Sequence, residues 1–306
     1  MFTLSVVVPA TNRPPTLPQC TTAIGRSAAR AEVVIVEHPA HLSASAARNA
    51  GARRATGDVL VFVDADVEVH PDALTRIREA FAARPGLTAV FGSYDDAPSA
   101  AGVVSAFRNL LHHHVHQNAA GSAETFWSGL GAVRRDAFLA VGGFDGDRFP
   151  HPSVEDIDLG ARLLARGARI VCDPAIQGTH LKAWTVRNML FTDFARRGVP
   201  WVAMQLRSGR SSTALNLGWR HRGSAAACAV GLVALLAGRP AIAVGPVLAL
   251  LALNHDFYTL LARRRGPREA ALGVALHALH HLTAVASVPA GVLAYAGERS
   301  RAAVTR

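Results

Sequence analysis

Three short runs of apolar residues near the N-terminus are continuous instead of alternating with polar residues. They are LSVVVPA at 4–10, AEVVIVEHP at 31–39 and DVLVFVDAD at 58–66. Runs of this length that are rich in β-branched residues are typical of strands buried on both faces of a parallel sheet. The stretches between them, about 15–28 and 44–55, are predicted to be helices. The alternation of strands and helices predicts an α/β domain with a mostly parallel sheet.

Each of these predicted strands is followed directly by polar residues. Asn12 follows the first strand, Glu37 follows the second, and Asp64 and Asp66 end the third. Ligands of open α/β sheets bind beyond the carboxyl ends of the strands. The sequence therefore predicts a binding site at this edge of the sheet.

The pattern continues through the middle of the chain. It predicts a strand at 87–94, an amphipathic helix at 103–117, an acidic helix at 153–167 and a strand at 168–174. The helix at 103–117 contains four histidines, His112, His113, His114 and His116. Residues 112 and 116 share a helical face from which 113 and 114 turn away, which argues against a shared metal ion.

The last third of the chain is strongly apolar. Residues 223–254 contain one charged residue, Arg239, and residues 270–297 contain none. A helix over 270–297 would be about 42 Å long, enough to cross a hydrocarbon core of about 30 Å. The first stretch, divided at Arg239 and Pro240, predicts a short helical hairpin. We therefore expect membrane-associated helices at 219–306, with buried helices of a soluble domain as the alternative.

The positive charge of the chain is concentrated in the same region. The net charge is +10, and residues 219–306 hold 10 basic residues against 3 acidic ones. Because this excess borders apolar segments and is not interleaved with aromatic residues, it favours an anionic membrane over nucleic acid. We expect residues 261–271, which are rich in arginine, to form a loop between the apolar segments. The positive-inside rule places this loop, and with it the preceding domain, on the cytoplasmic side of the inner (plasma) membrane.

The pair Asp64 and Asp66 is the first chemical signal. In an extended chain, residues i and i+2 point to the same side, so the two carboxylates lie close together. Such carboxylates repel each other unless a cation lies nearby, and hard divalent cations prefer oxygen ligands that they share with substrate phosphates. Alone, the pair also fits a solvated strand end.

The residues around this pair resemble the family 2 glycosyltransferases of the GT-A fold, of the membrane-anchored bacterial type with C-terminal transmembrane helices. The resemblance runs over roughly residues 1–180 and rests on LSVVVPATN, VVIVEHP, ARNAGARRATGDVLVFVDADVEVHPDAL, GLGAVRRDAFLAVGGFD and the Glu155–Asp156 pair followed by DLGARLLARG. It implies a GT-A domain at 1–218, with a nucleotide-sugar half at 1–100 and an acceptor half at 101–218. It also implies inverting transfer of a sugar from a nucleotide diphosphate-sugar.

The resemblance implies a role for individual residues. Asp156 would be the general base, with Glu155 as the second candidate. Asp66, Asp64 and His180 would hold a divalent cation, Mn²⁺ or Mg²⁺. The donor would be bound by Pro9, Ala10, Asn12, Glu37, Arg48, Asn49, Asp64, Gly129, Lys182 and Trp184. The acceptor would be a lipid-linked or other saccharide at the membrane.

Two other functions were weighed against this one. A non-catalytic nucleotide-sugar-binding scaffold is less favoured, because a degenerate relative would have lost some of the acids or His180. A sugar nucleotidyltransferase would carry a GxGTRLxP-type loop after the first strand, and PATNRPPTLP differs from it. HLKAWTVRNMLFTDFARRGVPW replaces the QxxRW motif of processive synthases, which favours a single transfer.

Overall fold

The computed structural model describes residues 2–40, 42–209 and 218–304. It divides into two compact units, which are described separately. The α/β unit comprises Met1–Ala100 and His112–Lys182, and the helical unit comprises Ala101–Leu111 and Ala183–Arg306. These limits differ from the expected domain boundary at residue 218, which stays a prediction about where the membrane-associated segment begins.

The α/β unit is built on one eight-stranded sheet, with the order β2-β1-β3-β7-β5-β8-β4 and β6 paired to β8. Strands β1, β2, β3, β5 and β8 run in one direction, and β4, β6 and β7 run against them. The expected α/β class with a mostly parallel sheet is therefore confirmed. The strands are β1 Leu4–Pro9, β2 Glu32–Val36, β3 Val59–Val63, β4 Val67–Val69, β5 Ala89–Tyr94, β6 Gly121–Ser122, β7 Leu130–Arg134 and β8 Ile170–His180.

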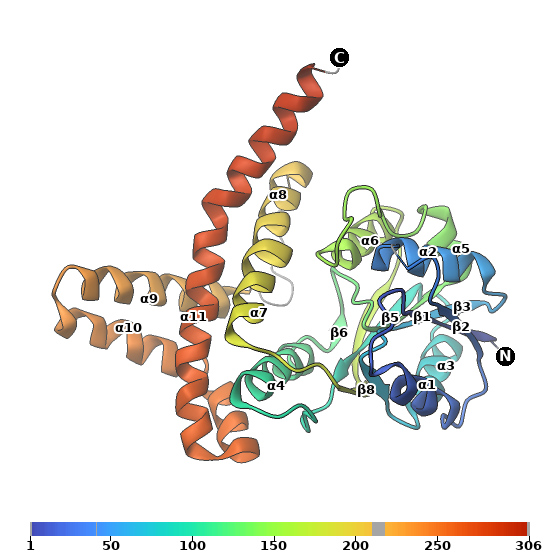
Figure 1. The fold of residues 1–306 in the computed structure, drawn as a ribbon, viewed down its shortest axis with the longest axis horizontal. Coiled ribbons are helices and arrows are strands. Elements are labelled where there is room, and N and C mark those ends of the chain that lie inside the picture. The colour runs from blue at the N-terminus through green and yellow to red at the C-terminus, as the bar shows by residue number, and fades with distance from the viewer. Residues whose placement is uncertain (1, 41, 210–217, 305–306) are drawn as a thin grey trace. The chain divides into compact units, whose positions relative to one another are not determined.

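Helices cover both faces of this sheet (Figure 1). Helices α1 (Leu17–Gly25) and α3 (Ala73–Ala83) lie on one face, and α2 (Ala44–Arg54), α5 (Arg135–Ala140) and α6 (Glu155–Leu164) on the other. Successive residues of a strand point to opposite faces. Val61 of β3 therefore joins the core with α1 and α3, whereas its neighbour Phe62 joins the core with α2, α5 and α6. This is why the central strands read as continuous apolar runs.

The strand register gathers the polar strand ends at one edge. Pro9 of β1 pairs with Val36 of β2, so both strands end together. The antiparallel strand β7 begins at the same edge, because its Leu130 pairs with Val63 of β3. Strand β8 runs further than the sequence predicted and ends at His180, which pairs with the first residue of β4. The sheet thereby places Asp64, Asp66 and His180 at a common edge.

The described part of the helical unit is built mainly of helices. Helix α4 (Val103–Gln117) begins in this unit and ends in the α/β unit. The others are α7 Val186–Phe191, the π-helix η1 Thr192–Gly198, α8 Val199–Ser208, α9 Trp219–Leu236, α10 Pro240–Leu253 and α11 His255–Val304. Within the described part of the chain, one helical segment, His255–Ser300, is long and apolar enough to cross a membrane.

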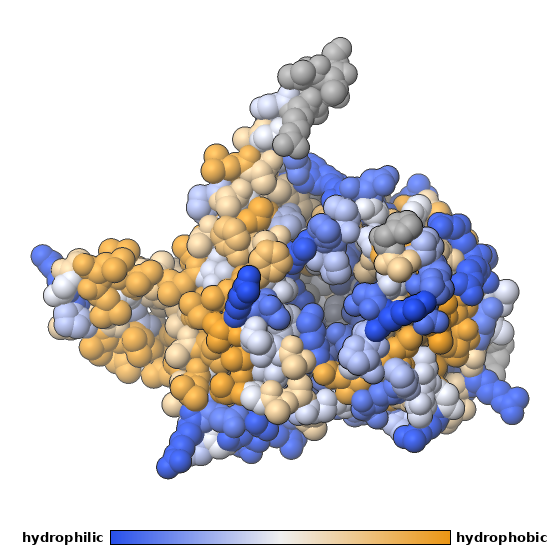
Figure 2. Space-filling view, viewed as in Figure 1, coloured by the Kyte–Doolittle hydropathy of each residue, from blue (hydrophilic) through white to orange (hydrophobic). Residues whose placement is uncertain are grey.

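The expected hairpin divided at Arg239 and Pro240 is present as α9 and α10. Figure 2 shows apolar side chains gathered over it, and those exposed include Val233, Leu236 and Leu248. The loop expected at 261–271 is reduced to a short break. Two helical stretches meet there at Gly266, which has a φ of 82° and a ψ of 167°, and the Arg265–Glu269 ion pair at 2.8 Å spans the break.

Candidate functional site

A buried arginine joins three elements of the α/β unit. Arg48 on α2 is 4% exposed. Its Nη2 donates to Asp64 Oδ1 at 2.6 Å, beyond the end of β3, and its Nη1 donates to Glu155 Oε1 at 3.1 Å, at the start of α6. The guanidinium therefore serves as a shared counter-ion for two carboxylates. As it stands, it faces protein acids, so its expected contact with the donor stays a prediction.

The adjacent acids Glu155 and Asp156 have different surroundings. Glu155 is buried, and its second oxygen accepts from the Ser153 N–H at 2.6 Å, so both of its oxygens are engaged. Asp156 is half-buried and contacts the Ser128 N–H at 3.4 Å, in the loop that leads into β7. Asp156 thus lies beside the strand edge while Glu155 holds Arg48 in place.

The Asp64 and Asp66 carboxylates are held in different electrostatic environments. Burial raises the pKa of Asp64 and the neighbouring Asp66 adds to the rise, although Arg48 opposes it. Burial alone would also raise the pKa of Asp66, but the hydrogen bond from His180 and the charges of His180 and Lys182 outweigh it and lower the pKa. Asp66 Oδ2 lies 3.5 Å from His180 Nε2. Asp66 is therefore held as a carboxylate facing His180, whereas Asp64 is paired with Arg48.

The His180 ring is fixed by an aromatic stack that the sequence did not reveal. The Tyr94 ring, at the end of β5, lies parallel to it with centroids 4.2 Å apart and an interplanar angle of 6°. The centroid of the Tyr94 ring in turn lies 4.3 Å from that of His112 and 5.0 Å from that of Trp127. His116 also packs here, with its Nδ1 2.8 Å from the Gly92 carbonyl. The histidine run of α4 therefore packs on β5 and supports the edge of the sheet.

Two of the expected donor-binding residues have clear packing roles. A Cβ at Gly129 would lie 2.4 Å from Cζ2 of Trp127, so only glycine fits beneath that indole. The Asn49 side chain donates to the Phe144 carbonyl at 2.7 Å and accepts from the Phe144 N–H at 2.9 Å, which fixes the loop after α5. The role of both residues toward a donor stays a prediction.

The residues expected around the nucleotide base follow β1 and β2. Ala10 is buried and its N–H donates to the Val36 carbonyl at 2.9 Å, which fixes the backbone just after Pro9. Asn12 is exposed and Glu37 is half-buried. The structure thus places these residues at the carboxyl ends of neighbouring strands, as the sequence predicted.

Lys182 and Trp184 fall on either side of the division between the units. Lys182 ends the α/β unit with an exposed side chain. Trp184 belongs to the helical unit, where its N–H donates to Ser105 Oγ at 2.9 Å and the Arg108 guanidinium lies 5.4 Å from its ring. Their expected joint role toward a diphosphate stays a prediction.

The donor set for a divalent cation is partly assembled. Across residues 2–40, 42–209 and 218–304, no three His, Cys, Asp or Glu side chains converge on a common point. Asp66 and His180 meet, whereas Asp64 is held by Arg48. An imidazole and a carboxylate suit Mn²⁺, and ions of this class commonly take further ligands from substrate phosphates. The Asp66–His180 pair therefore fits a cation that is completed by a bound diphosphate.

Comparison with known proteins agrees with this geometry. Residues 27–142 match the model of the glycosyl transferase family 2. Among solved structures, the mannosyltransferase PcManGT from Pyrobaculum calidifontis, in complex with GDP-Man and Mn²⁺, is 18% identical with a TM-score of 0.54. That alignment covers 96% of this chain and 87% of the other. The chain has a GT-A fold.

A second solved structure is that of GalNAc-T7 with UDP, GalNAc and Mn²⁺. It is 15% identical with a TM-score of 0.47, over 60% of this chain and 44% of the other. No curated protein matches the chain. The family match includes Asp64 and Asp66 and ends before Glu155, so the expected roles of the α6 acids and of His180 stay predictions.

Proposed function

We propose that the chain is an inverting glycosyltransferase that moves a single sugar from a nucleotide diphosphate-sugar to an acceptor hydroxyl. The observation that carries the proposal is the convergence of Arg48, Asp64, Glu155 and the Asp66–His180 pair at the carboxyl edge of a GT-A sheet. That edge is where open α/β sheets bind their ligands. The family match over residues 27–142 supports the same activity.

The nucleotide and the cation are assigned to the residues of that edge. Pro9, Ala10, Asn12 and Glu37 would hold the base and the ribose, at the ends of β1 and β2. Asp66 and His180, with Asp64 beside them, would hold Mn²⁺ or Mg²⁺. Such an ion, when bound, stabilises the negative charge that develops on the departing nucleoside diphosphate.

Asp156 is assigned as the general base. An acceptor hydroxyl must lose its proton as it attacks the sugar, and a positioned carboxylate accepts it. Asp156 lies at the N-terminus of α6, where the helix dipole favours an ionised carboxylate. Glu155 is assigned a positioning role, because both of its oxygens are already engaged. A single displacement of this kind inverts the anomeric centre and needs no enzyme nucleophile.

We further propose a lipid-linked acceptor at the cytoplasmic face of the inner membrane. The exposed apolar side chains of α9 and α10 support membrane attachment. The excess of basic residues at 219–306 supports an anionic lipid surface. A soluble saccharide acceptor is the alternative, and a comparison of the two acceptors on vesicles distinguishes them.

Nucleotide binding by the full chain in detergent tests the proposal. UDP-, GDP- and dTDP-sugars are titrated calorimetrically with and without Mn²⁺ into wild type, Asp66→Ala and Asp72→Ala. Asp72 is an exposed carboxylate paired with Arg76 at 2.6 Å, so its loss is a matched control. We expect one nucleotide to bind in the presence of the metal, with binding lost only in Asp66→Ala.

Turnover separates the enzyme from the non-catalytic scaffold. Asp156→Asn should keep donor binding but lose about 10²–10⁴-fold in the rate of nucleoside diphosphate release, the usual contribution of a general base. Donor binding without any turnover in wild type, with lipid-linked and soluble acceptors supplied, would favour the scaffold. Absence of all nucleotide binding would exclude both.

A further inference from the structure

The α9–α10 hairpin has the surface of a membrane-inserted element but is too short to cross a bilayer. Apolar side chains are exposed along both helices, among them Val233 at 66%, Leu236 at 79% and Leu248 at 58%. The 14 residues of α10 span about 21 Å, against a hydrocarbon core of about 30 Å. The hairpin turn carries the exposed Arg239. These features fit a hairpin that enters one leaflet and returns.

Helix α11 is not an isolated apolar span, because η1 and α8 run beside its second half. The residue numbers of the contacting pairs increase together along the two stretches. They join Asp193 to His280, Gly198 to Ser287, Val202 to Gly291, and Arg207 to Glu298. The two stretches are therefore parallel, and the end of α8 lies with the end of α11. Arg207 and Glu298 form an ion pair at 2.8 Å, so the ends of the two stretches stay on the same side of a membrane.

The first contact of this helix pair is ionic, and its His280 lies near the middle of the apolar stretch 270–297. Arg108 Nη2 donates to Asp193 Oδ1 at 2.5 Å, and His280 Nδ1 lies 2.7 Å from Asp193 Oδ2. Burial alone would raise the pKa of Asp193, but Arg108 and His280 hold it well below its usual range, so the group stays an anion. Arg196 and Arg197 lie within the next turn of η1. Charged groups at the centre of a bilayer are costly, so this part of α11 suits the interface better than the hydrocarbon core.

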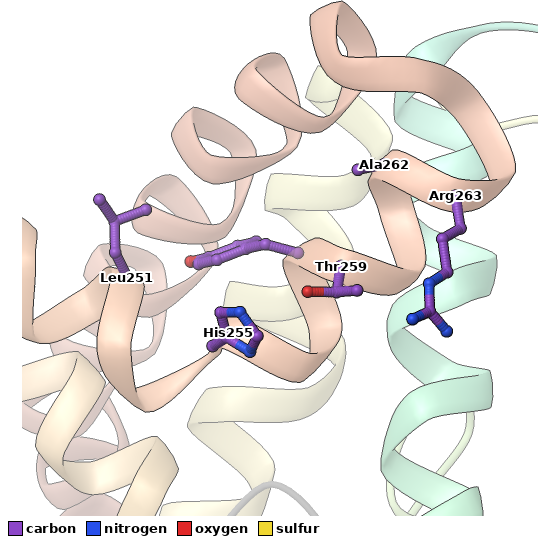
Figure 3. A pocket seen from close by; sticks show the side chains of 6 residues that line it. Leu251, His255, Thr259, Ala262 and Arg263 are labelled. Carbon is purple, nitrogen blue, oxygen red and sulfur yellow. The ribbon is translucent and has the colours of Figure 1, made fainter.

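The junction between α10 and α11 has the polarity of a headgroup boundary. A depression of about 480 Å³ lies there. Figure 3 shows its lining, with Leu251 on the α10 side and His255, Thr259 and Arg263 along one face of α11. Arg263 and Arg264 are exposed just before the interruption at Gly266. Basic residues beside an apolar hairpin are complementary to anionic headgroups.

We propose that the helical unit binds one leaflet of an anionic membrane from a single side, with the α9–α10 hairpin inserted and α11 lying in the interface beside η1 and α8. In Figure 1 the hairpin points away from α11 instead of running along it, so insertion of the hairpin does not require α11 to cross. This inference rests on the membrane attachment in the proposed function, and it replaces the full span expected at residues 270–297.

Thiol accessibility tests the proposal on the full chain. Burial raises the pKa of Cys20 and of Cys172 to about 12, so both stay unreactive and Cys228→Ala alone clears the background. A single cysteine is then introduced as Ala82→Cys on α3, Gly297→Cys on α11 or Leu236→Cys on the hairpin. Gly297 faces open space, so the new side chain fits. Each variant is added to vesicles of phosphatidylcholine and phosphatidylglycerol and treated with a membrane-impermeant maleimide.

We expect the chain to float with the vesicles and the cysteines at 82 and 297 to be labelled equally before permeabilisation. The cysteine at 236 should lose its labelling when vesicles are present. Labelling at 297 that requires permeabilisation would show a crossing and overturn the inference alone, as would unchanged labelling at 236. Failure to float would overturn the membrane attachment itself, while donor binding would still report on the proposed glycosyl transfer.

Discussion

Arg48 shows how one residue holds the candidate site together. Its guanidinium bridges an acid after β3 and an acid at the start of α6, which lie 91 residues apart in the chain (155 − 64). A buried ion pair of this kind contributes little net stability, but the loss of one partner leaves a buried charge uncompensated. The geometry therefore makes Arg48 a support for the acids at the sheet edge.

Replacing Arg48 with methionine should lower the free energy of unfolding by about 3–5 kcal/mol, because Asp64 and Glu155 then lack their shared counter-ion. Urea unfolding of the full chain in detergent, followed by far-UV circular dichroism, measures the change. Arg53→Met is the matched control, since Arg53 is exposed on the same helix. A similar decrease in the free energy of unfolding in both variants would contradict a stabilising role of the Asp64–Arg48–Glu155 bridge.

Glu32, on the edge strand β2, makes a pH-dependent contribution to the free energy of unfolding. Its Oε2 accepts from Ser5 Oγ at 2.5 Å and from the Thr56 N–H at 2.8 Å, and these bonds lower its pKa. The folded state thus binds fewer protons than the unfolded state. The stability it contributes is present above the unfolded pKa of about 4.3 and is lost as the pH falls through the lower folded pKa.

Glu32→Gln should therefore flatten the decline in the free energy of unfolding between about pH 6 and about pH 3. Denaturant unfolding at a series of pH values gives the slope for each protein. Glu79→Gln, an exposed change on α3, controls for the loss of one acid. Equal slopes in wild type and Glu32→Gln would rule out the proposed linkage.

The sequence located the acids of the site but not their supports. Asp64, Asp66 and Asp156 stand in short motifs, so they are visible as residue types at fixed spacing. The stacking of Tyr94 on His180 joins the ends of β5 and β8. These residues are 86 positions apart (180 − 94), so no local sequence pattern predicts their contact. The same holds for the engagement of both Glu155 oxygens, which separates its role from that of Asp156.

At the scale of elements, the buried strands were the most predictable parts. Strands β1, β2 and β3 lie within the predicted ranges, because their apolar runs are continuous. Strands β1 and β3 are covered on both faces, whereas β2 is an edge strand with Val33 exposed. The pattern of polar and apolar residues did not predict helices α7, η1 and α8, since α11, against which η1 and α8 pack, is distant in sequence. Strand β8 exceeded its predicted end because its pairing with β4 continues it to His180.

The pairing of α8 with α11 depends on a close approach at Gly291. A Cβ there would lie 2.5 Å from the Val202 Cβ and 3.0 Å from the Val199 carbonyl oxygen. Gly291→Ala should therefore destabilise the helical unit by about 1–3 kcal/mol through overpacking. Gly297→Ala on the same helix meets nothing within 4 Å and should stabilise it by up to about 1 kcal/mol through helix propensity.

Thermal unfolding of the two glycine variants in detergent checks this contrast. The expected result is a lower transition temperature for Gly291→Ala and an unchanged or higher one for Gly297→Ala. Opposite signs at two positions of one helix separate packing from propensity, because both variants add the same methyl group. A gain at both positions would show that α8 and α11 do not pack closely in solution.

For the whole molecule, charge and apolar surface are concentrated in the same part of the chain. Residues 219–306 carry a balance of +7 (10 − 3), and the α9–α10 hairpin exposes apolar side chains. The hydrophobic contribution to membrane binding is insensitive to salt, whereas attraction between basic residues and anionic lipid is screened within about 10 Å at 0.1 M salt. Vesicle binding should therefore contain one component of each kind.

Removal of two local charges isolates the electrostatic component. Arg263 and Arg264 lie beside the hairpin, and each basic residue near an anionic surface contributes about 1 kcal/mol, so changing both to glutamine should weaken binding to phosphatidylglycerol-rich vesicles roughly 30-fold at low salt. Flotation at a series of salt concentrations measures this loss, which should vanish at high salt and on neutral phosphatidylcholine. Changing Arg53 and Arg54 of α2 to glutamine alters the net charge equally in the α/β unit. If that control weakens binding as much, attraction follows the net charge of the chain and not the basic residues beside the hairpin.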